Sequence, residues 1–123
     1  CRYCQAHTGH NTARMSDAPD AQAEKRAQVL LYDTADCFSD AERAVIALAL
    51  AAGEVPNAAT QHHFDALTEH FSKRQITQIT AVISAFGFLN RWNDTVATAL
   101  EAQPTEFAQR ELSAGGWQLG KHG

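Results

Sequence analysis

The sequence predicts an all-α fold, a compact helical domain with a C-x-x-C pair at the start of its first helix. Apolar residues recur at helical steps of three and four along most of the chain. Two serine-initiated capping boxes mark helix starts, and no alternating strand pattern of useful length is present. The chain has 123 residues, of which 45% are hydrophobic, enough for one domain with its own core. We therefore expect a single domain over residues 1–123.

The chain begins with Cys1 rather than with methionine. A native start shows Met or a recognisable processed end. We therefore expect the N-terminal part of the fold to lie before residue 1.

The first two predicted helices are separated by a short polar break. The first runs from Cys1 to about Met15, and the Ser-Asp-Ala-Pro sequence at 16–19 ends it. Ser16 or Asp17 can cap the second helix, which has Pro19 in its first turn and runs to about Leu31.

A capping box at Ser39 to Glu42 begins the third predicted helix, Asp40 to Ala52. This helix is apolar almost all round, which indicates burial on most sides, in the core or at a subunit contact. Gly53 and Pro56 end it.

Two further helices follow in close succession. Thr60 caps a helix over Gln61 to Phe71, and a second capping box at Ser72 begins the longest helix, roughly Lys73 to Leu100. Short connections of this kind favour packed helical hairpins.

The apolar stripe of the longest helix turns polar at Asn90 and Asn93. Amides on such a stripe are at least partly buried and need partners, so they line a site, cap another element or face a sister subunit. After Pro104 we expect one short helix near Glu106 to Leu112 and then a loose tail.

Composition excludes several classes of protein. The net charge is -4 without a cluster of lysine and arginine, so nucleic-acid binding lacks its electrostatic basis. The longest nearly apolar run, Ala44 to Ala52, is too short to cross a bilayer, and no signal peptide is visible. We therefore expect a cytoplasmic protein with neither a nucleic-acid nor a membrane partner.

The first ten residues contain four residues of metal-ligand type, Cys1, Cys4, His7 and His10. On one helix, Cys1 and His10 lie roughly 13 Å apart along the axis and on opposite faces. No tetrahedral zinc ion bridges that separation. We therefore expect no metal and no cofactor in this stretch.

A redox role fits the same residues better. Steps of three keep Cys1 and Cys4 close enough for a disulfide and place His7 one turn beyond Cys4. Helix N-terminal amides and a nearby imidazole both favour the reactive thiolate. A peroxide oxidises one thiolate to a sulfenic acid, which the other thiol converts to a disulfide. The alternative is two buried thiols without a role, as we expect for Cys37.

Three segments resemble one protein family. Cys1–Thr8, Phe38–Ala44 and Phe86–Thr95 are similar to the carboxymuconolactone decarboxylase family, in its alkylhydroperoxidase D-like branch. The resemblance spans roughly residues 1 to 100. It implies a helical domain of the alkylhydroperoxidase D-like type that assembles into homo-oligomers, either trimers or hexamers.

The resemblance also implies site roles. Cys4 becomes the thiol that attacks a hydroperoxide substrate, Cys1 the resolving thiol and His7 the proton relay, with an external dithiol reductant of unspecified identity. The sequence departs from the family pattern in two ways. The histidine stands three residues after the second cysteine, where the family often has four and this chain has Thr8. The relay glutamate is expected before Cys1, whereas Glu101 is expected on a helix surface.

The resulting hypothesis is a thiol-dependent peroxidase, an antioxidant oxidoreductase with peroxiredoxin-like activity. Two alternatives remain. A carboxymuconolactone decarboxylase-type lyase does not need a dithiol, so the intact C-x-x-C argues against it. A non-enzymatic helical oligomeric binding protein with incidental thiols is the other.

Overall fold

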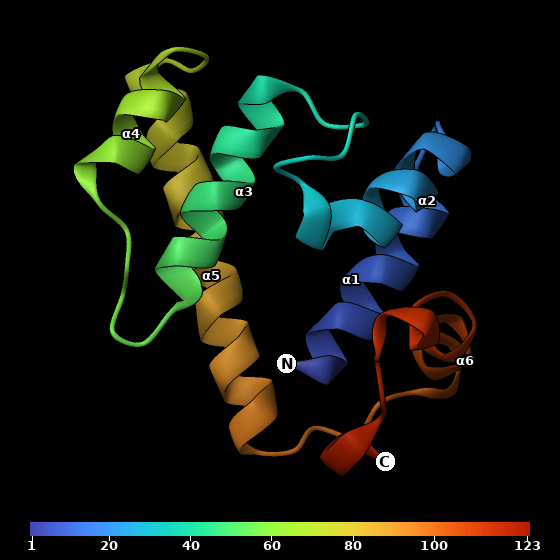
Figure 1. Cartoon of the computed structure of the whole chain (residues 1–123). Coiled ribbons are helices and arrows are strands. Elements are labelled where there is room, and N and C mark those ends of the chain that lie inside the picture. Colours follow the sequence, from blue (N-terminus) through green and yellow to red (C-terminus); the bar gives the residue numbers. More distant parts are fainter. The chain divides into compact units, whose positions relative to one another are not determined.

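A computed structural model describes the backbone of residues 1–123 and every side chain except that of Pro19. Throughout this described part, the regular structure is helical and contains no strand, which confirms the predicted all-α class (Figure 1). The α-helices, in chain order, are α1 (Arg2–Met15), α2 (Pro19–Gln28), α3 (Asp40–Gly53), α4 (Gln61–Thr68), α5 (Lys73–Thr95) and α6 (Ala102–Glu111).

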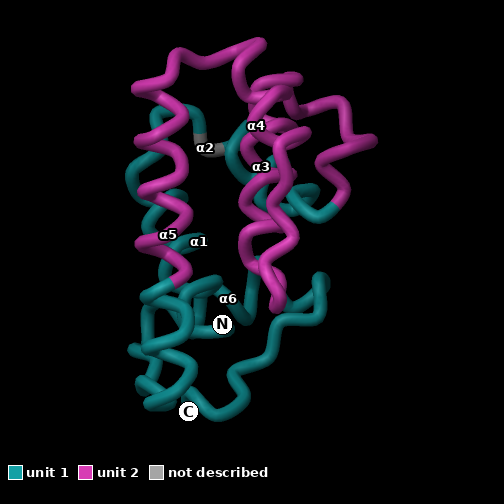
Figure 2. Tube along the Cα trace, turned by 90° about the vertical axis from the view of Figure 1, so that its left-hand side faces the viewer, with its two compact units in different colours: residues 1–30, 88–123 teal, residues 31–87 magenta. Residues whose placement is uncertain are grey.

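The chain divides into two compact units, coloured separately in Figure 2. Unit 1 contains residues 1–30 and 88–123, and unit 2 contains residues 31–87, so that the boundary falls inside α5. Each unit has its own buried residues. The expectation of one domain over residues 1–123 stays a prediction.

Unit 1 is built on the packing of α1 against α6. Ala6, Ala108 and Trp117 form its buried centre. Gly9 is also buried there, and a Cβ atom at this position would lie 2.8 Å from Cε1 of Phe107. The helix therefore has a glycine in its interior because the two helices approach closely at this point.

The start of α2 differs from the prediction. Its N-cap residue is Ala18 rather than Ser16 or Asp17, and the Ser16 hydroxyl instead accepts a hydrogen bond from the Ala18 amide at 3.1 Å. The helix ends at Gln28, and a 3₁₀ turn over Val29–Leu31 carries the chain to the predicted end. A serine two residues before an amide forms a local turn with it, which competes with capping.

The C-terminal tail is not loose, so that expectation is wrong. Trp117 is 6% exposed and His122 is 1% exposed. The Trp117 indole donates to the Arg2 carbonyl at 3.1 Å, and the Leu100 amide donates to the His122 carbonyl at 2.8 Å. Apolar burial and hydrogen bonds to distant backbone order the tail, which sequence pattern alone does not reveal.

The two helices at this end of the chain also have different limits from those predicted. Helix α5 ends at Thr95 rather than Leu100, because Ala97 adopts a left-handed φ of 50°. Helix α6 begins at Ala102, before the predicted Glu106. Pro104 fits within its first turn, where its missing N–H has no intrahelical partner to lose.

Unit 2 is built on α3 and α4, with Leu48 and Leu67 buried. The predicted capping box is present: the Ser39 amide donates to Glu42 at 2.9 Å, and the Glu42 amide donates to the Ser39 hydroxyl at 3.3 Å. Leu50 on α3 is 45% exposed, so the chain itself covers only part of this apolar helix. A subunit contact on α3 stays a prediction.

Helices α4 and α5 begin as predicted. The Thr60 amide donates to the His63 ring at 3.1 Å, and the Ser72 amide donates to Gln75 at 2.9 Å. Helix α4 ends at Thr68, three residues before the predicted Phe71.

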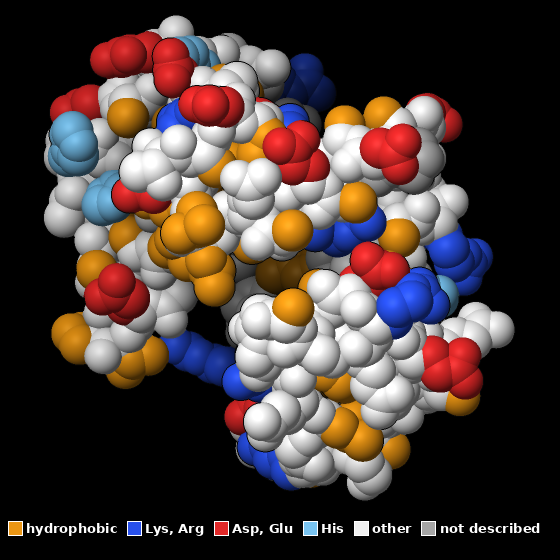
Figure 3. All heavy atoms as spheres, turned by 45° about the vertical axis from the view of Figure 1, so that its right-hand side comes forward, with side chains coloured by type: hydrophobic (Ala, Val, Ile, Leu, Met, Phe, Trp, Pro, Cys, Tyr) orange, Lys and Arg blue, Asp and Glu red, His pale blue; other side chains and the backbone are white. Residues whose placement is uncertain are grey.

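Two features of the structure concern the partners that the composition argues against, nucleic acid and membrane. Acidic and basic side chains are interspersed on the face shown in Figure 3. Among the described residues, none of the helices combines the length and the apolar character needed to cross a bilayer.

Candidate functional site

The dithiol lies at the beginning of α1. Cys1 is the N-cap residue, Cys4 lies in the first turn, and both are half-buried free thiols. Residues three apart on a helix are surface neighbours, with Cβ atoms about 5–6 Å apart. A disulfide needs Cβ atoms about 3.5–4.5 Å apart, so its formation requires a local shift at the start of α1.

Asn93 from α5 supplies a polar partner for Cys4. Its Nδ2 lies 3.9 Å from the Cys4 Sγ and donates to the Leu89 carbonyl at 3.0 Å. Its Oδ1 accepts from the Thr98 hydroxyl at 2.8 Å, which orients the amide with its N–H groups toward the sulfur. An N–H donor at this position stabilises negative charge on sulfur. Asn93 therefore lines the site, as one of its predicted roles requires.

His7 pairs with a carboxylate from a distant part of the chain. Its Nε2 lies 2.6 Å from Oε2 of Glu101, the N-cap residue of α6. The hydrogen bond from His7 holds the pKa of Glu101 below its ordinary value. Because the carboxylate accepts the Nε2 proton, the neutral ring presents Nδ1 as its proton acceptor.

Glu101 is exposed, as expected, and it also pairs with His7. The relay glutamate expected before Cys1 stays a prediction. His7 and Glu101 are 94 positions apart, so no sequence pattern links them.

Tyr3 packs against His7. Its ring centroid is 4.5 Å from that of His7. Burial raises the pKa of Tyr3, and the charges of Glu101 and Cys4 raise it further. The phenol therefore stays protonated, and the ring screens one side of the imidazole from solvent.

Helix α1 brings all three predicted site residues, Cys1, Cys4 and His7, to its N-terminal half. The helix continues through His10. On one continuous helix, the two cysteines and the two histidines are too far apart to share a zinc ion. The His10 ring lies against Phe107, with centroids 5.8 Å apart. Cys37 belongs to unit 2 and is half-buried, whereas a buried residue was expected.

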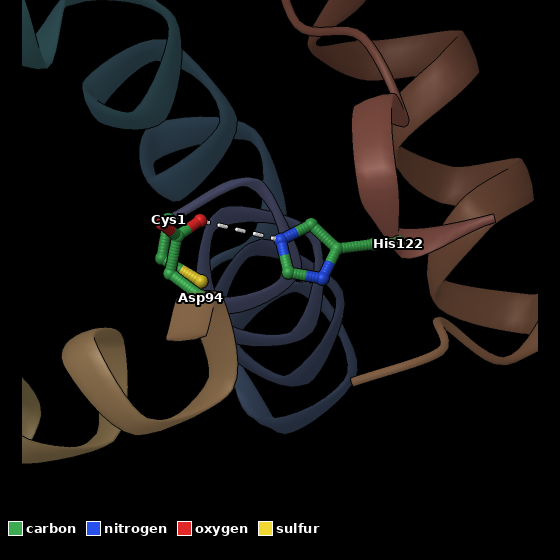
Figure 4. Close-up of side chains that lie close together, drawn as sticks. All are labelled: Cys1, Asp94 and His122. Atoms are coloured by element: carbon green, nitrogen blue, oxygen red, sulfur yellow. Dashed lines mark ion pairs between the residues drawn. The ribbon is translucent and has the colours of Figure 1, made fainter. Parts of the chain in front are cut away.

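A second group of ligand-type atoms surrounds Cys1. The Cys1 Sγ, a carboxylate oxygen of Asp94 and a ring nitrogen of His122 lie within 4.8 Å of one another (Figure 4). All three residues belong to unit 1. In the sequence analysis, Asp94 had no assigned role and His122 was placed in a loose tail, so both partners were missed.

No family model matches the chain, and no curated protein matches it significantly. Solved structures similar to it include two of the debrominase Bmp8. The crystal structure of apo Bmp8 has a TM-score of 0.78 and 31% sequence identity, over 89% of this chain and 56% of that chain. The structure of a cysteine-to-alanine variant in complex with 2,3,4-tribromopyrrole has a TM-score of 0.78 and 30% identity, with the same coverage.

These structures identify the fold. Bmp8 has the helical fold of the alkylhydroperoxidase D-like and carboxymuconolactone decarboxylase-like proteins, and the chain shares it. The predicted fold class is thus confirmed. The chain spans only about half the length of the Bmp8 structures that it matches.

Proposed function

We propose that the chain belongs to the alkylhydroperoxidase D-like branch and that it reduces hydroperoxides through the Cys1 and Cys4 dithiol. One observation carries this proposal: the His7 and Glu101 pair, 2.6 Å apart, lies one helical turn from Cys4. A thiol, a base and a group that orients the base are the parts of an activated nucleophile.

The reaction begins with Cys4. His7 takes the thiol proton, and the thiolate attacks one peroxide oxygen, breaking the O–O bond. His7 returns the proton to the departing alkoxide, so that ROOH and the Cys4 thiol become ROH and a Cys4 sulfenic acid. The Cys1 thiol then attacks the sulfenic sulfur, which gives a disulfide and releases water.

The surrounding residues have supporting roles in this scheme. Glu101 positions His7 and stabilises the imidazolium that forms when the thiol proton is transferred. Asn93 points an N–H group at the Cys4 sulfur. An external dithiol then reduces the disulfide. We also propose the homo-oligomeric assembly that the family resemblance implies.

A second candidate reaction is reductive debromination. The structures that the chain resembles are of a debrominase, one of them a cysteine-to-alanine variant holding 2,3,4-tribromopyrrole. A dithiol supplies the two electrons this reaction needs: a carbon–bromine bond and two thiols become a carbon–hydrogen bond, a disulfide and HBr. The same Cys1 and Cys4 pair serves both reactions.

A single-turnover experiment tests both reactions. The reduced chain is mixed with one equivalent of an organic hydroperoxide or of 2,3,4-tribromopyrrole, and mass spectrometry maps the thiols. Hydroperoxide-driven loss of two hydrogens at Cys1 and Cys4, with Cys37 still free, supports the peroxidase. Disulfide formation with the bromopyrrole but not with the hydroperoxide supports debromination.

One outcome would exclude both dithiol reactions. If Cys1 and Cys4 oxidise no faster than Cys37 with either substrate, the dithiol function is wrong. A lyase or a binding protein then becomes the better interpretation, and turnover of a lactone acid by a double Cys→Ser variant would identify the lyase.

A further inference from the structure

His122 has an unusual environment for a histidine near a chain end. Its side chain is 1% exposed, and its Nδ1 lies 2.9 Å from the Thr98 carbonyl oxygen. A carbonyl only accepts hydrogen bonds, so Nδ1 carries the proton. In the neutral ring, the Nε2 lone pair then faces inward.

The Nε2 atom of His122 is buried and has no hydrogen-bond partner within the described part of the chain. The Asp94 Oδ1 is 3.6 Å away, beyond ordinary hydrogen-bonding range. A buried polar atom without a partner is costly, so native structures rarely contain one without an ion, a water or a function.

The atoms that face Nε2 are those of a metal site. They are the Cys1 Sγ and a carboxylate oxygen of Asp94, and all three atoms lie within 4.8 Å of one another (Figure 4). Two ligands of one tetrahedral zinc ion lie roughly 3.3–3.8 Å apart, given Zn–N near 2.0 Å and Zn–S near 2.3 Å. The 3.6 Å between Nε2 and Oδ1 is close to the roughly 3.3–3.5 Å expected for a nitrogen and an oxygen ligand.

The outer contacts have the form that metal ligands require. The Thr98 carbonyl holds the His122 tautomer with Nε2 free, and Lys121 Nζ contacts the other carboxylate oxygen, Oδ2 of Asp94, at 3.0 Å. Such second contacts orient imidazole and carboxylate ligands in metalloproteins. They leave Nε2 and Oδ1 directed at the same space.

We infer that Cys1, Asp94 and His122 form a divalent transition-metal site with one open coordination position. Thiolate, imidazole and carboxylate together favour zinc. On binding, the Cys1 thiol loses its proton to solvent and its sulfur bonds to the metal. This site does not depend on the proposed peroxidase activity.

The site has one consequence that does rest on the proposed function. Cys1 is the thiol that resolves the Cys4 sulfenic acid, and a sulfur bonded to zinc is not free to attack it. Zinc binding and the Cys1–Cys4 disulfide are therefore mutually exclusive, and zinc restrains the dithiol cycle.

Cobalt substitution tests the site directly. The reduced, metal-free full chain is titrated with Co²⁺, with a short N-terminal tag so that the α-amino group of Cys1 cannot act as a ligand. A thiolate-to-cobalt charge-transfer band is expected at one equivalent. Cys1→Ser should abolish the band, and Asp94→Asn should weaken cobalt binding at least about 10-fold.

Matched variants complete the test. Cys4→Ser keeps the band, because Cys4 is not a ligand. His122→Gln should weaken binding like Asp94→Asn, and a circular-dichroism melt checks that this buried substitution leaves the chain folded. If Asp94→Asn or a folded His122→Gln chain keeps full affinity, or if the native chain shows no band, the site is wrong.

The redox consequence has its own readout. Saturating Zn²⁺ should slow peroxide-driven formation of the Cys1–Cys4 disulfide at least about 10-fold, and a chelator should restore the rate. A chain that binds cobalt but never forms the disulfide refutes the proposed function and leaves the site standing. A chain that forms the disulfide but binds no cobalt refutes the site alone.

Discussion

Both units of the chain contain a cysteine and histidines, but only unit 1 brings them together. In unit 2, His63 contacts the Thr60 amide three residues away, and the His62 ring contacts its own neighbour. In unit 1, His7 meets Glu101 across 94 positions, and Asn93 meets Cys4 across 89. Reactive residue types become a site only where tertiary contacts supply a partner from elsewhere in the chain.

The largest expected effect distinguishes Cys4 in unit 1 from Cys37 in unit 2. Cys4→Ser should lower peroxide turnover by about 1000-fold or more, because it removes the sulfur that attacks the peroxide in the proposed reaction. The matched Cys37→Ser variant in unit 2 should keep the native rate. Single-turnover mass spectrometry and steady-state peroxide consumption measure both variants. Equal losses in the two variants would remove the distinction.

The next effect concerns the long-range carboxylate. Glu101→Gln keeps an oxygen that accepts from His7 but loses the charge that stabilises an imidazolium, so turnover should fall on the order of 100-fold. Glu106→Gln, an exposed change in the same helix, is the control. Peroxide consumption is measured, with circular dichroism to show that both variants are folded. A native rate in Glu101→Gln would exclude Glu101 from the mechanism.

Two glycines compare helix packing in the two units. Gly9→Ala should lower the free energy of unfolding by about 1–3 kcal/mol, because the new Cβ would lie 2.8 Å from Phe107. At Gly87, inside α5, a Cβ meets nothing within 4 Å. Gly87→Ala should therefore stabilise the chain by roughly 0.5–1 kcal/mol. Urea unfolding measures both, and a tolerated Gly9→Ala would mean that α1 and α6 pack less closely.

A local cap in unit 2 should have a smaller effect. Ser39→Ala removes the hydroxyl that accepts from the Glu42 amide at the start of α3. We expect a loss of about 1 kcal/mol in the free energy of unfolding, with peroxide turnover unchanged. Ser39→Asp should restore most of the lost stability. Loss of turnover without loss of stability would contradict the separation between the cap and the site.

The smallest expected effect is a change in the pKa of Glu101. The hydrogen bond from His7 holds the pKa of Glu101 below its ordinary value of 4.5. The stabilising contact is therefore fully present above the ordinary value and is lost as the pH falls through the lowered one. In His7→Phe, the Glu101 pKa should return toward 4.5. NMR of the side-chain carboxyl carbon measures it, and an unchanged pKa would mean that another group causes the shift.

Local sequence patterns are enough to predict the helical class and most helix starts. Ser39 with Glu42 and Ser72 with Gln75 are capping pairs three residues apart, so local chemistry sets them whatever the rest of the chain does. The spacing of Cys1 and Cys4 on α1 is local in the same way. The position of Asn93 on an apolar stripe predicts an amide that is at least partly buried, and Asn93 is half-buried.

The contacts that these residues make depend on how distant segments of the chain pack. Glu101 on His7, Asn93 on Cys4 and the burial of Trp117 and His122 all depend on packing between distant segments. The start of α2 and the end of α5, by contrast, depend on local turn geometry that periodicity does not reveal. Hydrogen bonds and apolar burial act through space and leave no spacing in the sequence. The residue types at the candidate site can therefore be predicted from the sequence, while their partners cannot.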